Sequence, residues 1–140
     1  MTSPASNRAR WCLAVVALGV ALPLMAALWV AVSLWLGPPA VWMAVLVAAD
    51  GGLLLSLMRL PKGPARVVAN LVFLAACCAL SAWFLVATHV GLAFGLDPFE
   101  SSTRLGPVLF QAIASGWLGG LEALWLAAAV GVAVWWNLRA

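Results

Sequence analysis

Two carboxylic acids that interrupt apolar stretches are the residues of this sequence best suited to chemistry. Asp50 lies in the run VAADGGLLL, and Glu122 lies in GGLEALWLAAA. A charged side chain at the centre of a bilayer costs about 2.5–3.5 kcal/mol. Because the apolar stretches contain no lysine or arginine except Arg59 at the very end of one of them, the protonated form of each acid is the cheaper one. If the two acids lie close together, repulsion between their charged forms also keeps at least one proton on the pair.

Other polar residues recur at helical spacing between positions 70 and 122. Helix positions separated by 7, 11 or 18 residues fall on nearly the same face. This rule gives two stripes, which are Asn70, Cys77, Ser81 and Thr88 in one apolar stretch and Gln111, Ser115 and Glu122 in the next. Since polar side chains avoid lipid, both stripes should face the interior of a helical bundle.

The midpoints of the apolar stretches place three of these groups at one depth. Asp50, Ser81 and Glu122 each lie near the centre of a stretch. We therefore predict that they form one site, which holds a proton, a transported cation or the charge of another subunit. The competing interpretation is that they hydrogen-bond between helices, although such bonds contribute only about 0.6 kcal/mol on average.

Tryptophans deep in the stretches offer a second feature. A buried indole N–H needs an acceptor, so these side chains either pack and hydrogen-bond between helices or line an apolar cavity. As pocket residues they could also make cation–π contacts with a ligand. The candidates are Trp83, Trp117 and Trp125.

The sequence predicts no metal site, cofactor or disulfide. His89 is the single histidine, whereas a metal site needs three or four suitable ligands and a haem needs an axial partner. Cys12, Cys77 and Cys78 lie within apolar stretches, where cysteine acts as a small apolar packing residue.

Composition places the whole chain in a membrane. Of its 140 residues, 66% are hydrophobic and 8% are charged, against about 25% charged residues in soluble domains. A membrane helix needs about 20 apolar residues. The sequence therefore predicts an all-α membrane protein, a single-domain bundle of four antiparallel transmembrane helices over residues 11–36, 40–60, 67–95 and 107–137.

The basic residues predict the orientation of these helices. Six of the seven lie before the first stretch, at the end of the second or between the second and third, or after the fourth. The connection 96–106 instead carries Asp97, Glu100 and a single arginine. By the positive-inside rule, both termini are cytoplasmic and the expected location is the inner (plasma) membrane, as a multi-pass protein. The first stretch is too long for a signal-peptide core and is expected to remain as a helix.

The size and four-span layout resemble those of the small multidrug resistance transporters, which use a membrane-embedded glutamate in the first helix as a shared proton and drug site. Here the first span, WCLAVVALGVALPLMAALWVAVSLWL, contains no acid. The layout also resembles that of quinone-linked disulfide-generating membrane enzymes, which need paired cysteines in outer loops, and this chain has none there. The chain is therefore assigned to neither family.

Two functions remain as expectations. The first is an accessory or structural subunit of a membrane complex, or a homo-oligomeric membrane component, in which Asp50 or Glu122 pairs with a partner's charge. The alternative is a proton-coupled small-molecule transporter or exporter that uses both acids, with the three tryptophans lining its pocket. An enzyme is not expected, because no motif joins a nucleophile to a base. Nucleic acid is not an expected partner, because the basic residues are scattered at helix ends rather than gathered into a stripe.

Overall fold

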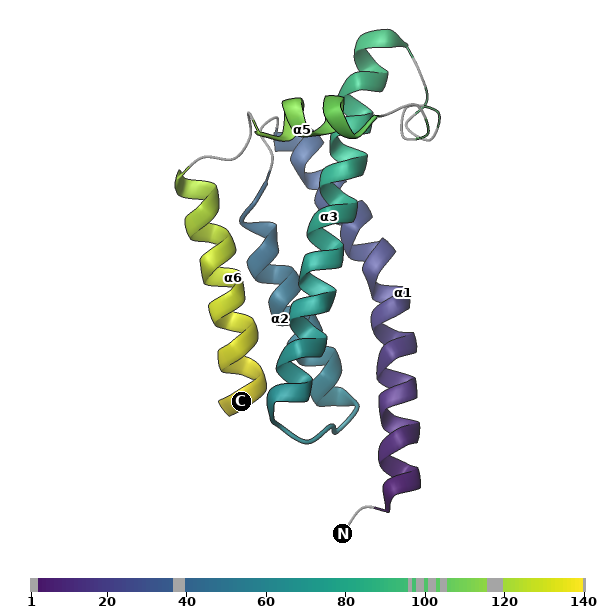
Figure 1. Cartoon of the computed structure of the whole chain (residues 1–140), viewed down its shortest axis with the longest axis vertical. Helices are drawn as coiled ribbons and strands as arrows, with labels where there is room; N and C mark the ends of the chain where they lie inside the picture. The colour runs from purple at the N-terminus through teal and green to yellow at the C-terminus, as the bar shows by residue number, and fades with distance from the viewer. Residues whose placement is uncertain are drawn as a thin grey trace.

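The regular elements of the protein are helices throughout the part of the chain that the structure describes. The computed structural model describes residues 3–36, 40–95, 97, 100, 103, 106–115 and 120–139. Figure 1 shows the arrangement of the five helices labelled there. They are α1 (Pro4–Leu36), α2 (Met43–Leu57), α3 (Pro64–Phe94), α5 (Pro107–Ser115) and α6 (Gly120–Arg139).

Three of these helices are long and apolar enough to cross a membrane. They are α1, α3 and α6, of 33, 31 and 20 residues. At 1.5 Å per residue, the 15 residues of α2 span only about 22 Å, less than the roughly 30 Å of a hydrocarbon core. Together with the composition, the three long helices support a membrane protein.

Proline and left-handed backbone set several helix ends. Pro64 and Pro107 open α3 and α5, because proline tolerates the first helical turn, where its missing N–H needs no partner. The α3 helix ends at Gly95, which has φ of 69° and bonds back to the Gly91 carbonyl. At the end of α2, Arg59 has φ of 54°, and the Leu60 N–H reaches the Leu55 carbonyl. This is a Schellman-type ending with arginine in the position usually taken by glycine.

The helices pack around α2, which contacts α1, α3 and α6. Figure 1 shows α1 and α3 running upward and α2 and α6 running downward, so that both chain ends lie at the lower end. The largest core cluster lies among these four helices. It is built mainly from small or slim side chains, including Ala44, Val47, Ala48, Ala129 and Ala133. Small residues let helix backbones approach closely inside a membrane.

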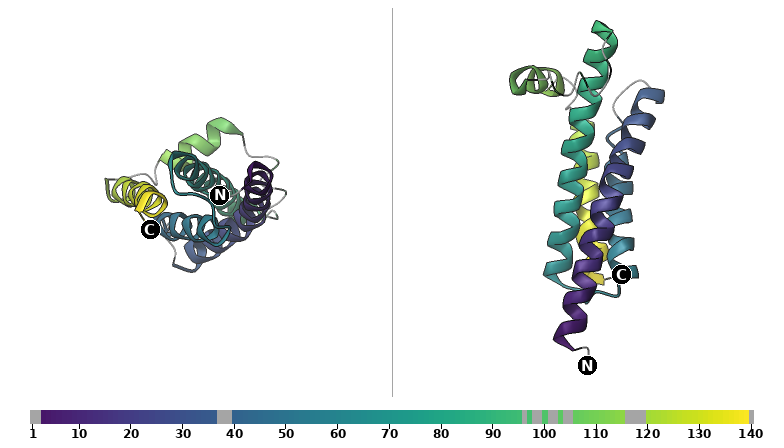
Figure 2. Two further views of the ribbon diagram at one scale, coloured as in Figure 1. Left: turned by 90° about the horizontal axis from the view of Figure 1, so that it is seen from below. Right: turned by 90° about the vertical axis from the view of Figure 1, so that its right-hand side faces the viewer.

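The last apolar stretch differs from the single helix expected over 107–137. The structure describes two helices there, α5 and α6, and Figure 2 shows α5 lying across the upper end of the molecule rather than in line with α6. Residues 116–119, which include Trp117, lie outside the described residues. The sequence at this point, GWLGG, is rich in glycine, which is the poorest helix former after proline. A stretch of 31 residues is also longer than one bilayer crossing requires.

Candidate functional site

Asp50 lies in the middle of α2 and is half-buried. Its carboxyl group forms no hydrogen bond and no ion pair with the described part of the chain. Its level in the structure is set by a bond two residues away, in which Asn70 Nδ2 of α3 donates to the Ala48 carbonyl at 3.0 Å. Asn70 is fully buried. The polar residue of α3 that lies level with Asp50 is therefore Asn70.

Ser81 and Glu122 lie at other depths. Ser81 is 11 residues beyond Asn70 on the same helix, which corresponds to about 16 Å along the axis. On the other side, Gly52 of α2 packs against Trp136 of α6, and α2 and α6 run in the same direction (Figure 1). Glu122 lies 14 residues before Trp136, so it is separated from the level of Asp50 by roughly 18 Å.

The structure therefore does not bring Asp50, Ser81 and Glu122 together. Glu122 belongs to the first turn of α6, where the positive end of the helix dipole favours an acid. Ser81 is 2% exposed, and its hydroxyl lies beside the Cys77 thiol of its own helix. The expected matched depth assumed one straight helix over 107–137, and the break between α5 and α6 moves Glu122 to a helix end.

A buried arginine is the centre of the polar cluster that the structure does assemble. Arg66 lies in the first turn of α3 and is 2% exposed. Its Nε donates to Asn137 Oδ1 at 2.8 Å, and its Nη1 reaches the Leu60 carbonyl at 3.5 Å. Its Nη2 donates to Ser56 Oγ and lies 3.4 Å from the Gly52 carbonyl. The guanidinium group thus joins α2, α3 and α6.

Ser56 connects a fourth side chain to this cluster. Its hydroxyl donates to the Gly52 carbonyl at 2.8 Å and accepts from the Trp136 indole N–H at 3.3 Å as well as from Arg66. One donated and two accepted bonds use the full capacity of a hydroxyl. Asn137 completes the arrangement by donating to the Ala133 carbonyl at 2.6 Å. We call Arg66, Ser56, Trp136 and Asn137 the arginine cluster.

Among the described residues, no carboxylate bonds to the Arg66 guanidinium group, although it is a buried cation. Its acceptors are Gly52 and Ser56 in the second half of α2, Leu60 just after α2, and Asn137 in the last turn of α6. Helix C-termini carry the negative end of the helix dipole, which stabilises a cation there. Two such ends meet at Arg66, so backbone and neutral side chains replace the usual counter-ion.

The sequence predicts Arg66 in the connection between residues 60 and 67, at the aqueous boundary, whereas the structure buries it. The signal was present, because Arg66 lies 4 and 11 residues before Asn70 and Cys77. These separations put it on the same helix face as the polar stripe. The helix begins at Pro64 instead of Val67, so a basic residue lies inside it at the end nearest the chain termini.

The remaining stripe residues do not form a common site. Thr88 bonds to the carbonyl of Phe84 in its own helix at 2.7 Å. Gln111 and Ser115 are exposed on α5, and Ser115 bonds within its helix to the Ala112 carbonyl. Because α5 and α6 are separate helices, Gln111 and Ser115 do not share a helix face with Glu122.

The deep tryptophans also differ in their surroundings. Trp83 of α3 packs against Phe110 of α5, with ring centroids 5.3 Å apart. Trp125 is 40% exposed on α6. Neither lines a described cavity. The pocket of three tryptophans is therefore not seen among the described residues, with Trp117 outside them.

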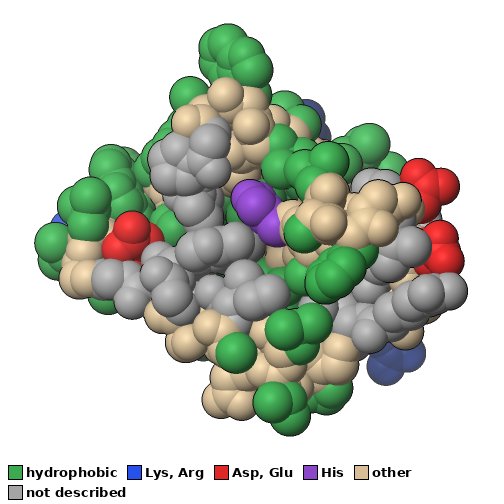
Figure 3. Space-filling view, turned by 90° about the horizontal axis from the view of Figure 1, so that it is seen from above, with side chains coloured by type: hydrophobic (Ala, Val, Ile, Leu, Met, Phe, Trp, Pro, Cys, Tyr) green, Lys and Arg blue, Asp and Glu red, His purple; other side chains and the backbone are tan. Residues whose placement is uncertain are grey.

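At the upper end, His89 contacts the carbonyl of Leu85 through its Nδ1 at 2.8 Å. Figure 3 looks onto this end and shows the histidine in the middle, with acidic side chains toward the edges. Among the described residues, no three metal-ligating side chains gather into a group. Comparison with known protein families, curated proteins and solved structures found no match.

Proposed function

We propose that this protein is a small polytopic protein of the inner (plasma) membrane that serves as a structural or accessory subunit of a membrane complex, or as a homo-oligomeric membrane component. In this proposal α1, α3, α6 and the apolar stretch 40–60, of which α2 is the helical part, are four antiparallel spans, and both termini are cytoplasmic. Charge supports the orientation, because Arg10 bonds to the Arg59 carbonyl and Lys62 to the Arg139 carbonyl at the end where the termini lie. By the positive-inside rule, this end faces the cytoplasm.

The contrast between Arg66 and Asp50 carries the functional part of the proposal. The buried cation is fully used to join helices of this chain. Asp50 is half-buried within α2 and has no bonded partner among the described residues. Ionisable groups inside a membrane are costly and usually pair with another polar group. Asp50 therefore fits a basic or hydrogen-bond-donating side chain of a neighbouring subunit.

The exporter hypothesis receives less support from this geometry. It depended on a coupled pair of acids, and Asp50 and Glu122 lie roughly 18 Å apart in depth. Both described cavities are lined almost entirely by apolar side chains and contain neither acid. A subunit role needs no polar path through the protein, and none is formed by these residues.

The experiment compares complexes recovered from native membranes in a mild detergent. A tagged chain with Asp50→Asn or Asp50→Leu is purified beside the unchanged protein and a Glu122→Gln control. We expect the unchanged chain and the control to migrate as a larger assembly on native gels, and both Asp50 variants to release most of the associated chains. Unaltered assembly in both Asp50 variants, with normal thermal unfolding, would rule out Asp50 as the partner contact. Proton-driven efflux that is abolished by the Asp50 variants and also by Glu122→Gln would favour the exporter instead.

A further inference from the structure

A long apolar groove runs between α1 and α3. Its lower part is a cavity of about 300 Å³ lined by residues that include Val15, Gly19, Ala69 and Ala76. Its upper part is a cavity of about 550 Å³ whose lining begins at Pro23 and Leu80 and reaches Leu34. On α1 the lower lining ends at Leu22 and the upper one begins at Pro23, and on α3 they adjoin at Ala76 and Leu80. The two cavities are therefore parts of one groove. From Val15 to Leu34 it extends 19 residues, or about 28 Å, close to the thickness of a hydrocarbon core.

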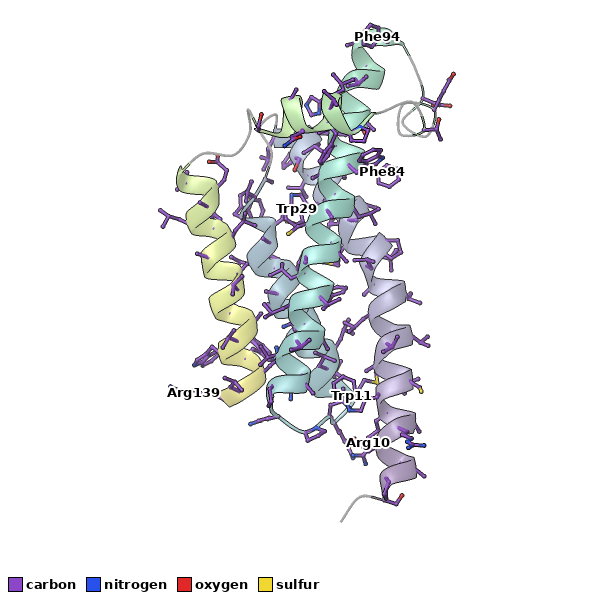
Figure 4. All side chains as sticks on the ribbon, viewed as in Figure 1. Arg10, Trp11, Trp29, Phe84, Phe94 and Arg139 are labelled. Atoms are coloured by element: carbon purple, nitrogen blue, oxygen red, sulfur yellow. The ribbon has the colours of Figure 1, made fainter. Side chains whose placement is uncertain are left out.

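The lower mouth of this groove is basic and amphipathic. Arg8 and Trp11 precede Val15 by seven and four residues in the same continuous helix, so they lie on the face of α1 that lines the groove. Arg8 is exposed. Arg10 Nη1 bonds to the Arg59 carbonyl at 3.4 Å, which brings two more basic residues to this end. Figure 4 shows Arg10 and Trp11 at the lower end of α1, beside the connection between α2 and α3.

Among the described residues, no carboxylate pairs with the basic residues at this mouth. The bonds that Arg10 and Lys62 make go to backbone carbonyls, and the described acidic residues lie in α2 or toward the other end of the molecule. An anionic phospholipid matches this pattern, because it carries a phosphate at the depth of the basic residues and an acyl chain that enters an apolar groove. Its leaflet is the one on the side of the chain termini.

We propose that the lower half of the α1–α3 groove binds an acyl chain of an anionic phospholipid whose phosphate lies against Arg8. The small side chains of Gly19, Ala69 and Ala76 leave the space that the chain occupies. Trp11 lies between the basic residues and the groove, at the level of the glycerol backbone, where tryptophan is favoured. This inference does not depend on which protein partner Asp50 contacts.

The test measures lipid retention by the purified full chain with native mass spectrometry. Palmitoyl-oleoyl phosphatidylglycerol and phosphatidylcholine, which share acyl chains, are titrated into the delipidated protein, with glycerol 3-phosphate as a chain-free probe. We expect tight retention of phosphatidylglycerol only. Replacing Arg8 by glutamine should weaken it roughly fivefold, and Arg10→Gln, which changes the opposite face of α1, should weaken it less. Arg139→Gln, at the same end but on α6, is the charge control.

Groove filling provides the second arm. A Cβ built on Gly19 or on Gly131 meets no atom within 4 Å, and both positions are exposed, so each is open to a larger side chain. Gly19→Leu fills the groove and should abolish preferential retention, whereas Gly131→Leu, on α6, should leave it unchanged. Equal retention of the two lipids by the unchanged chain, or equal behaviour of the two leucine variants, would overturn the proposal. Binding of glycerol 3-phosphate at the same strength would show a phosphate site without a lipid groove, which also contradicts it.

Discussion

Arg66 of α3 donates a 2.8 Å hydrogen bond from its Nε to Asn137 Oδ1 of α6. The two residues are 71 positions apart in the sequence, and both are almost completely buried. Their bond ties the start of one long helix to the end of another, and the same guanidinium group reaches the last turn of α2. A single side chain therefore connects three helices at the end of the molecule that contains both termini.

Removing the guanidinium group should destabilise the protein. Arg66→Met keeps the unbranched stem of the side chain but leaves Asn137 Oδ1 without its donor. Hydrogen bonds to charged groups contribute about 1.5–3 kcal/mol each, and interhelical bonds in membranes about 0.6 kcal/mol on average, so we expect a loss of about 2–3 kcal/mol. Reversible unfolding in mixed micelles measures it. Arg66→Lys should recover only part of the loss, because lysine cannot reach three helices with fixed, planar donors.

The matched control for this prediction is Arg139→Met. Arg139 is exposed at the end of α6, so its side chain should contribute less than about 0.5 kcal/mol. Equal stability of the two methionine variants would mean that the arginine cluster contributes nothing to folding. A double-mutant cycle with Asn137→Ala separates the direct pair from the contacts to α2.

Two adjacent glycines set the spacing of α2 from its neighbours. A Cβ on Gly51 would overlap the Asn70 side chain, and a Cβ on Gly52 would lie 2.7 Å from the Trp136 ring. We expect Gly51→Ala and Gly52→Ala each to cost about 1–3 kcal/mol, the usual range for an overpacked core. Gly131→Ala, where the added carbon meets nothing within 4 Å, should be neutral or should stabilise the helix by up to about 1 kcal/mol. Thermal unfolding of the three variants provides the comparison.

Removing the Asn70 side chain tests whether Gly51→Ala destabilises the protein through a clash with it or through the backbone of α2. Asn70→Ala removes the side chain that Gly51→Ala would strike, so the double variant should be more stable than the sum of the two single changes predicts. Strict additivity would mean that contact with the Asn70 side chain is not the reason for glycine at position 51, and would leave the Phe73 ring, 2.9 Å from the added Cβ, as the close neighbour. Because Asn70 also donates to the Ala48 carbonyl, the single Asn70 variant serves as its own reference.

The sequence predicted the helical class well because helix and membrane both follow from local composition. Apolar length indicated the helices, and Pro64 and Pro107 lie at the helix starts that proline favours. Depth and tertiary contact could not be predicted in the same way. The midpoint of a stretch gives the depth of Glu122 only if the stretch is a single helix, and α5 and α6 are two.

The arginine cluster shows a different limit. Helical spacing placed Arg66 on the face of Asn70, but sequence alone assigns a basic residue at the end of an apolar stretch to the aqueous boundary. Its burial depends on acceptors from the ends of α2 and α6, supplied by residues before and after it in the chain. Asn137, 71 residues away, is not linked to Arg66 by any local pattern. Such partners emerge only when the helices are packed.

Cysteine labelling of intact cells tests the orientation and the number of spans. Asp97 and Lys62 lie beyond the opposite ends of α3, so a single cysteine at each position reports on one side of the membrane. The native cysteines, Cys12, Cys77 and Cys78, are first replaced by serine or alanine. If the termini are cytoplasmic, a membrane-impermeant maleimide should label Asp97→Cys in intact cells and Lys62→Cys only after lysis. Labelling of both positions in intact cells would mean that α3 does not cross the membrane. The reverse pattern would mean that the basic end faces outward, against the direction that its charge favours.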